Sequence, residues 1–149
     1  MRDVFFRGKR KDNGVWIEGF LIVCDERYFI LPANVFKCFY FAWLKHNEYV
    51  FGMFIEVIPE TVGQYTGLTD KNGKKIFEGD IASITALGND HFQKGARTTA
   101  CIENYMGNSC ICVYGGSLGV TLHSILIDHT VEVIGNIHDN PELLKGGAE

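Results

Sequence analysis

The sequence predicts a mainly β protein, built as a small antiparallel β-barrel or sandwich-like module, and three observations predict it. Short runs rich in β-branched and aromatic residues recur along the 149-residue chain. The 17 glycines exceed the average usage of about 7%. Turn signals separate the runs at intervals of roughly ten residues, which is the spacing of strands in antiparallel barrels and sandwiches.

The strands are expected between these turns, at residues 15–23, 28–31, 49–58, 81–85, 97–104, 109–114, 119–127 and 131–137. An Asn-Gly pair occurs in Asp12-Asn13-Gly14 and in Lys71-Asn72-Gly73. This pair suits a two-residue hairpin turn, because both central positions need a positive φ. The glycine-rich run 115–119 is interpreted as a β-turn and not as a phosphate-binding loop, because it has no lysine and no helical pattern follows it.

Two helical segments are expected. Residues 34–45 favour a short helix capped by Asn34, with a strand as the alternative. The C-terminus favours one short helical turn, with Asp139 or Asn140 as the N-cap and Pro141 at the first helical position.

The length suits one domain covering residues 1–149, with two sub-lobes, 1–59 and 60–149, as the possible subdivision near Pro59. The N-terminus lacks the apolar run of a signal peptide, and the five cysteines suggest reduced thiols. The most apolar stretch, 35–44, is about half the length that crosses a bilayer. The prediction is a cytoplasmic protein with no membrane partner.

Catalytic and metal-binding motifs are weak. No G-x-S-x-G motif occurs, so no catalytic residue is assigned and no enzyme is expected. Cys110 and Cys112, with Cys101 and His123, have the atoms of a metal site, but their C-x-C spacing departs from the usual C-x₂₋₄-C of zinc sites. The cysteines are therefore interpreted as small buried hydrophobes, and no metal or cofactor is expected.

Nucleic-acid binding is the alternative function. The net charge of −4 opposes a sequence-independent grip on phosphates. However, basic residues near Phe5, Phe6 and Trp16 could stack bases and follow a phosphate backbone. The competing interpretation is an edge strand kept soluble by its charges. The candidate residues are Arg2, Arg7, Lys9, Arg10, Lys11, Lys71, Lys74 and Lys75.

Self-association is the leading expectation. The chain has eleven phenylalanines, six tyrosines and two tryptophans, and the aromatic run at 36–54 exceeds what one small core hides. A large apolar patch on a protein surface usually marks an interface. The sequence therefore predicts a non-enzymatic binding or assembly module that forms homo-oligomers, and it does not identify a small-molecule ligand.

Three sequence blocks carry a family resemblance: MRDVFFRGKRKDNGVWIEGF at the start, GQYTGLTDKNGKKIFEGDI at 63–81, and VEVIGNIHDNPELLK near the end. With these blocks in this order, the chain resembles the YopX family of bacteriophage and prophage proteins. The resemblance implies a β-rich, phage-associated protein, which places the expected cytoplasm in a bacterial host cell, and it carries over no catalytic role. The motif residues are Gln64, Tyr65, Gly67, Asp70, Asn72, Gly73, Gly79, Asp80, Gly135, Asn136 and Pro141.

These motif residues are expected to be structural. Gly67 and Gly73 suit turn positions with positive φ. The carboxylate of Asp70 can fold back on the backbone of its own turn. Asp80 is interpreted as a turn cap that accepts backbone N–H bonds, with contact to a ligand as the alternative.

Overall fold

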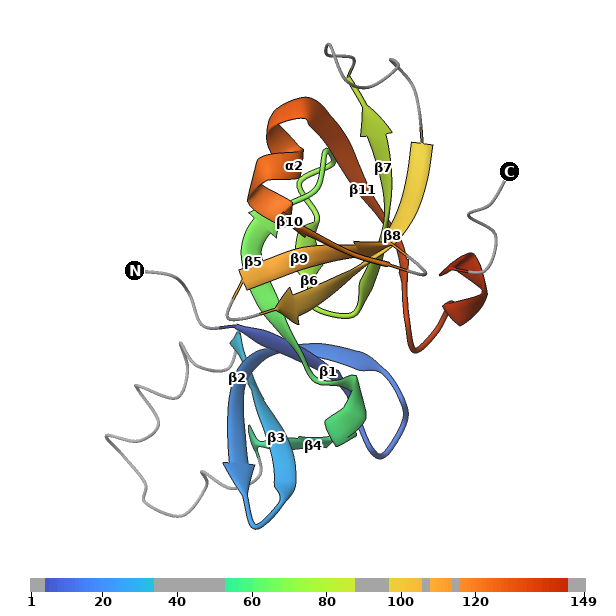
Figure 1. Cartoon of the computed structure of the whole chain (residues 1–149). Coiled ribbons are helices and arrows are strands. Elements are labelled where there is room, and N and C mark those ends of the chain that lie inside the picture. Colours follow the sequence, from blue (N-terminus) through green and yellow to red (C-terminus); the bar gives the residue numbers. More distant parts are fainter. Residues whose placement is uncertain (1–4, 34–52, 88–96, 106–107, 114–115, 145–149) are drawn as a thin grey trace. The chain divides into compact units, whose positions relative to one another are not determined.

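The protein is mainly β, with two antiparallel sheets, which confirms the predicted class (Figure 1). The structure is a computed structural model that describes residues 5–33, 53–87, 97–105, 108–113 and 116–144. Within these residues the sheets are open, so the sandwich-like form of the prediction holds and the barrel does not. No helix in the described ranges has the length and apolarity needed to cross a membrane.

The chain forms two compact units, Met1–Tyr65 and Thr66–Glu149. The sequence placed the possible subdivision near Pro59. The two units instead divide within a strand, β5 (Gly63–Thr69).

The first unit is a curled antiparallel sheet with the strand order β4-β3-β2-β1-β5. Besides β5, its elements are β1 (Phe6–Lys9), β2 (Trp16–Cys24), β3 (Arg27–Pro32), β4 (Ile55–Val57) and the 3₁₀ helix η2 (Pro59–Thr61). The amide of Ile58 donates to the carbonyl of Lys9 at 2.8 Å, and that of Lys11 donates to the carbonyl of Glu56 at 3.0 Å. These bonds bring β4 back to the end of β1, which lies between β2 and β5 and is not an edge strand.

The concave face of this sheet is tightly packed. Ile30 and Val57 are 0% and 1% exposed, and Gly8 and Gly19 face them. A Cβ atom at Gly19 would lie 1.9 Å from the carbonyl oxygen of Leu31. The curl of the sheet therefore requires glycine at this position.

The hairpin turns differ from the prediction. At the tip of β2–β3, Asp25 and Glu26 form the two-residue loop and have φ angles of 48° and 61°. Both central positions of this turn are thus left-handed, without an Asn-Gly pair. Asp and Asn tolerate this conformation better than other non-glycine residues.

The two Asn-Gly pairs lie in longer loops. The amide of Gly14 donates to the carbonyl of Arg10, which closes a four-residue loop, and that of Gly73 donates to Asp70, which closes a three-residue loop. Only the glycine of each pair has a positive φ. The predicted two-residue turns are therefore wrong, because each loop combines a right-handed turn with one left-handed glycine.

The second unit contains a five-stranded sheet of order β10-β9-β8-β7-β11, and the hairpin formed by β5 and β6 joins its core. Its further elements are β6 (Lys75–Phe77), β7 (Asp80–Ala86), β8 (Arg97–Tyr105), β9 (Asn108–Val113), β10 (Gly116–Thr121), α2 (Leu122–Asp128), β11 (His129–Asn136) and the 3₁₀ helix η3 (Pro141–Leu144). One core cluster draws on both groups of strands and on α2: Ile76, Ala82, Ile84, Ala100, Ile102, Leu122, Val131 and Val133.

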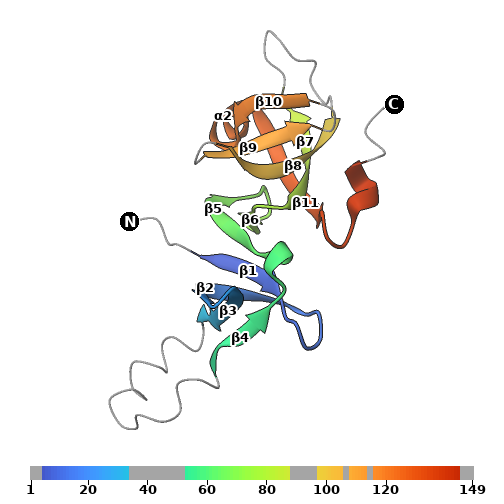
Figure 2. The same ribbon diagram turned by 60° about the horizontal axis from the view of Figure 1, so that its bottom comes forward.

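The prediction of a strand at 119–127 is wrong for most of this segment. It contains the end of β10 and most of α2, which contacts β9, β10 and β11 (Figure 2). The side chain of Thr121 caps the helix by accepting from the amide of Ser124 at 3.3 Å. Leu122 is buried, and Ile125 and Leu126 pack against the core, which is the i, i+3, i+4 spacing of a helix.

The interpretation of the glycine-rich run 115–119 as a β-turn is also wrong, since residues 116–119 belong to strand β10. The predicted C-terminal turn is confirmed as η3, which begins at Pro141. The predicted helix at 34–45 lies outside the described residues. Of the strand predicted at 49–58, the described part forms β4.

Candidate functional site

The central motif turn, Asp70–Lys74, is held by one buried carboxylate. Asp70 is 6% exposed. Its Oδ1 accepts from the amides of Asn72 at 2.8 Å and Lys74 at 2.9 Å, as the sequence predicts. Its Oδ2 accepts from the amide of Val133 at 3.1 Å, a contact that the sequence did not predict.

The electrostatics of Asp70 reflect two opposing effects. Burial raises the pKa of its carboxyl, while the hydrogen bonds from Val133, Lys74 and Asn72 and the charge of Lys74 lower it. The net pKa is below its ordinary value, because the backbone donors satisfy the charged form. Asp70 is therefore an ionised structural anchor.

The same turn covers the outer edge of β11. The amide of Lys71 donates to the carbonyl of Val131 at 2.9 Å, and the side-chain ammonium of Lys71 pairs with Glu132 at 2.6 Å. Exposed strand edges can pair with other chains, and covering them prevents this. The Asp70–Lys74 turn thus closes one edge of the five-stranded sheet.

The second motif turn also bonds to the scaffold. Asp80 is 1% exposed, and its Oδ2 accepts from the amide of Phe77 at 2.8 Å. Gly79, with φ of 79°, donates its amide to the carbonyl of Ile102 and accepts from the amide of Ile137. This turn therefore joins β8 to the end of β11.

The remaining central-block residues lie in β5. Gln64 pairs with Phe6 of β1, and the amide of Tyr65 donates to the carbonyl of Phe5 at 2.7 Å. Gly67 has the expected positive φ of 82°, but it lies within the strand and not in a turn.

The C-terminal motif residues build a compact turn. The side-chain oxygen of Asn136 accepts from the amides of His138 and Asp139, at 3.0 and 2.9 Å. A Cβ atom at Gly135 would lie 2.7 Å from Oδ1 of Asn140. Gly135 thus leaves the space into which the segment leading to Pro141 folds.

A different kind of surface lies on the convex side of the first unit, termed the outer face. Strand register places alternate side chains of β1 to β4 on it: Arg7, Lys9, Trp16, Glu18, Phe20, Ile22, Cys24, Arg27, Phe29, Leu31 and Glu56. Leu31, which lies opposite Phe20, is only 5% exposed. Phe20 and Ile22 are 36% and 41% exposed. This surface therefore combines apolar side chains with charges of both signs.

Aromatic rings organise the outer face. Above the ring centroid of Trp16, the guanidinium carbon of Arg7 lies at 4.9 Å and Nζ of Lys9 at 5.5 Å. Phe20 meets Phe5 edge to face, with the ring centroids 5.7 Å apart. Such cation–π and aromatic contacts hold the side chains of a surface in defined positions.

An apolar pocket of about 440 Å³ lies at the far end of the outer face from Trp16. Its apolar lining comes from Ile22, Phe29 and Phe54, and its rim from Cys24, Asp25 and Arg27. The guanidinium of Arg27 lies 5.0 Å from the ring centroid of Phe29. The thiol of Cys24 is free and exposed.

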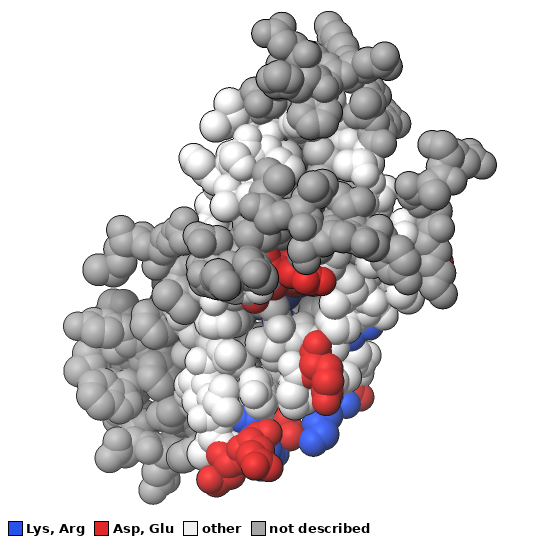
Figure 3. All heavy atoms as spheres, in the orientation of Figure 1, with Lys and Arg blue, Asp and Glu red and all other residues white. Residues whose placement is uncertain are grey.

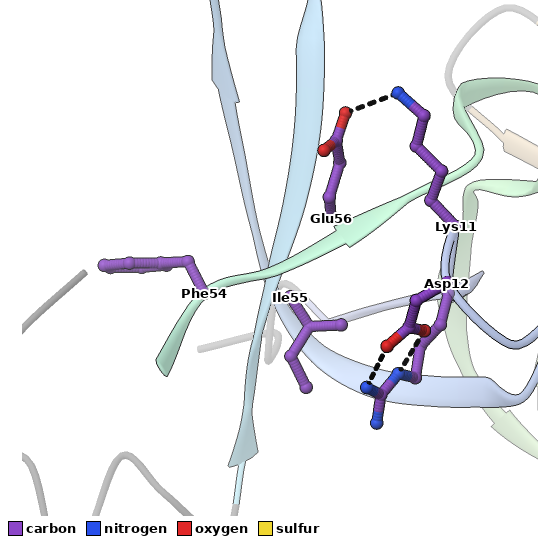
Figure 4. Close-up of a pocket in the computed structure, with 6 residues that line it drawn as sticks. Lys11, Asp12, Phe54, Ile55 and Glu56 are labelled. Atoms are coloured by element: carbon purple, nitrogen blue, oxygen red, sulfur yellow. Dashed lines mark hydrogen bonds and ion pairs between the residues drawn. The ribbon is translucent and has the colours of Figure 1, made fainter. Parts of the chain in front are cut away.

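A second pocket, of about 390 Å³, lies between β4 and the loop after β1 (Figure 4). Two ion pairs line it, Arg10–Asp12 at 2.5 Å and Lys11–Glu56 at 2.8 Å, and Phe54 projects away from both. Glu56 also binds Arg27 at 2.6 Å. Hydrogen bonds from Arg27 and Lys11 lower the pKa of Glu56 to about 2. The charged groups of this pocket thus bind one another.

The candidate nucleic-acid-binding residues do not form one free basic patch among the described residues. Arg10, Lys11 and Lys71 form ion pairs with carboxylates. Lys74 is exposed at the motif turn, Lys75 is half-buried, and Arg2 lies outside the described residues. In the described part of the first unit, acidic side chains outnumber basic ones by six to five, and the two are interspersed (Figure 3).

The metal-site candidates are only partly described. Cys101 is buried and lies opposite Cys112 in the register of β8 and β9. His123 is exposed on α2. The side chains of Cys110 and Cys112 lie outside the described set.

Comparisons with known proteins agree with the three motif blocks. The family model described as YopX protein matches residues 6–145, so the chain belongs to the YopX family. Over 97% of its length it is similar to the solved structure of protein EF1440 from Enterococcus faecalis, of which it covers 99%, with 25% identity and a TM-score of 0.56. No curated protein matches the chain.

Proposed function

We propose that this protein is a non-enzymatic binding or assembly module, encoded by a phage or prophage, that self-associates through the outer face of its first unit in the bacterial cytoplasm. The observation that supports this most is the nature of that face. It exposes Phe20 and Ile22 beside an apolar pocket. Apolar side chains around a pocket, rimmed by charge, are typical of protein–protein interfaces.

The contrast with the motif residues supports the same assignment. The carboxylates of Asp70 and Asp80 accept backbone amides within the second unit. Glu56, in the first unit, is engaged by two cations. These carboxylates already serve structural roles, so the proposal assigns the protein binding and not catalysis.

Sedimentation velocity over a range of protein concentrations tests the proposal. The expected result is a concentration-dependent shift from monomer to a larger species at low and at moderate salt, because apolar contact is little screened. A monomer at every concentration would reject self-association.

The alternative is a nucleic-acid-binding accessory protein, which the Arg7–Trp16–Lys9 cluster favours. Basic and aromatic side chains on one sheet face can bind single strands by stacking and by charge. Fluorescence anisotropy with labelled single-stranded DNA tests this alternative. Binding that weakens steeply with salt supports it, and an absence of binding at low salt rejects it.

A further inference from the structure

The outer face carries opposite features at its two ends. Strand β2 runs from Trp16 to Cys24, and Phe20 is its central residue. At the Trp16 end lie the cations Arg7 and Lys9. At the Cys24 end lie the apolar pocket and the acidic hairpin tip formed by Asp25 and Glu26.

These ends are complementary in shape and in charge. One end presents a half-buried tryptophan with two cations, and the other presents an apolar pocket beside the two carboxylates of Asp25 and Glu26. The cation on the pocket rim, Arg27, is paired with Glu56, and the first end also carries one carboxylate, Glu18, opposite Arg7. Trp16 and Cys24 are each four residues from Phe20, which in an extended strand is about 13 Å at about 3.3 Å per residue. Consider a second copy related by a 180° rotation about an axis that passes over Phe20 and is perpendicular to β2. Each end of one copy then lies against the complementary end of the other.

We propose, as a deepening of the proposed function on which it rests, that the partner of the outer face is a second copy of this chain, with the two-fold axis passing over Phe20. The axis lies in the plane between the two faces and is perpendicular to β2, so the two β2 strands run antiparallel across the interface. Trp16 of each copy enters the pocket of the other. Lys9 of each copy then faces Asp25 and Glu26 of the other.

This arrangement follows the general properties of symmetric interfaces. A two-fold interface uses the same surface on both copies, so one self-complementary face is sufficient. Buried tryptophans that fill a pocket are among the residues that contribute most to binding. The interspersed charges favour the register in which opposite signs meet and disfavour parallel alignment, in which like charges meet.

The first experiment places a charge on the axis. The variant Phe20→Arg brings two guanidinium groups together at the centre, so we expect its dimer dissociation constant to rise by about 100-fold or more in sedimentation. The matched control is Leu87→Arg, which puts the same side chain at a 51% exposed apolar residue of the second unit. The control should dimerise like the unaltered protein, and circular dichroism verifies that both variants fold.

The second experiment exchanges charges between copies. Lys9→Glu and Glu26→Lys should each weaken the homodimer by about tenfold or more, because the first sets a carboxylate against Asp25 and Glu26 of the other copy and the second sets an ammonium against Lys9. An equimolar mixture of the two variants allows a heterodimer in which the substituted carboxylate of one copy faces the substituted ammonium of the other. In that heterodimer only the contact of the substituted carboxylate with Asp25 stays unfavourable, so we expect it to form with higher affinity than either variant homodimer.

The third measurement follows Cys24, whose thiol is exposed in one copy alone. In the proposed dimer, Trp16 of the other copy covers it. Peptide mapping after alkylation should show its modification slowing by about tenfold or more as the dimer forms, roughly as the fraction of free copies falls. Trp16→Ala should abolish this protection.

The outcomes separate the two proposals. A strict monomer overturns both self-association and this arrangement. A dimer that tolerates Phe20→Arg, or that leaves Cys24 equally reactive at all concentrations, overturns the arrangement and leaves self-association standing. A failure of the charge-exchanged variants to form heterodimers overturns the register.

Discussion

The motif turns of the second unit and the outer face of the first unit use their polar residues in opposite ways. In the motif turns, the carboxylates of Asp70 and Asp80 are buried and bind backbone amides. On the outer face, charged side chains lie at the surface beside exposed Phe20 and Ile22. The residues of the central family block thus maintain the scaffold, while the outer face draws in part on the N-terminal family block, which supplies Arg7, Trp16 and Phe20.

The comparison has a physical basis. A buried carboxylate is tolerated only when donors satisfy it, so its neighbours are tightly restricted. Surface positions accept many side chains with little effect on stability. Scaffold substitutions should therefore reduce stability, and outer-face substitutions should alter association instead.

The largest effect is expected for Gly19→Ala on the concave face. Its Cβ would collide with the backbone of Leu31, which a side-chain rotation cannot relieve. We expect the free energy of unfolding in urea to fall by about 3 kcal/mol. Gly14→Ala is the control, because nothing lies within 4 Å and only its φ of 69° opposes the change. Equal losses in the two variants would contradict the close-approach explanation.

The next effect is expected for Asp70→Asn. The amide group of asparagine cannot accept all three backbone amides, so we expect a loss of about 2 kcal/mol at pH 7. The native pKa of Asp70 lies below its unfolded value, so its stabilisation is present above about pH 4 and is lost as the pH falls through the native pKa. The difference between variant and unaltered protein should therefore shrink in acid.

Urea titrations at several pH values measure this difference. Asp25→Asn is the control, since Asp25 is exposed at a hairpin tip. A difference for Asp70→Asn that does not depend on pH would show that the charge of Asp70 has no structural role.

A smaller effect is expected for Gly73→Ala in the Asp70–Lys74 turn. Gly73 has φ of 80° and open space around it, so the cost is conformational only, about 1 kcal/mol. Gly73→Asn should cost less, because asparagine tolerates the left-handed region. Thermal unfolding measures both, and an asparagine variant less stable than the alanine variant would contradict this explanation.

The smallest effect on stability is expected for Ile22→Ser on the outer face. Ile22 is 41% exposed, so unfolding should change by no more than about 0.5 kcal/mol, while self-association weakens. Ile127→Ser is the control at a 70% exposed residue of α2. A loss of association in both variants would show that the effect is not specific to the outer face.

Much of the fold could be predicted from the sequence because it depends on local patterns. Short runs of β-branched and aromatic residues between turn signals predicted the strands that became β2, β3, β7, β8, β9 and β11. The Pro141 turn followed from helix-start signals. The helix α2 was missed, because the β-branched run 119–127 hid the helical spacing of Leu122, Ile125 and Leu126.

The site was less predictable, because it depends on contacts between residues distant in sequence. The basic residues were visible in the sequence, but the pairing of Lys11 and Arg27 with Glu56 was not. The pocket needs Ile22, Phe29 and Phe54 from three parts of the chain. The aromatic run at 36–54, on which the prediction of self-association depended, lies mostly outside the described residues, and the outer face now carries that proposal.

The sequence by itself determined the β class, the family and the Asp70 and Asp80 turns, because these depend on residues within a few positions of one another. The tertiary structure alone decided that Asp70 reaches Val133, 63 residues away, and that Trp16 and the pocket lie at opposite ends of one face. The physical reason is strand pairing. Register sets which side chains share a face. The pairings of β1 with β5 and of β3 with β4 join segments far apart in the sequence, so no local pattern specifies them.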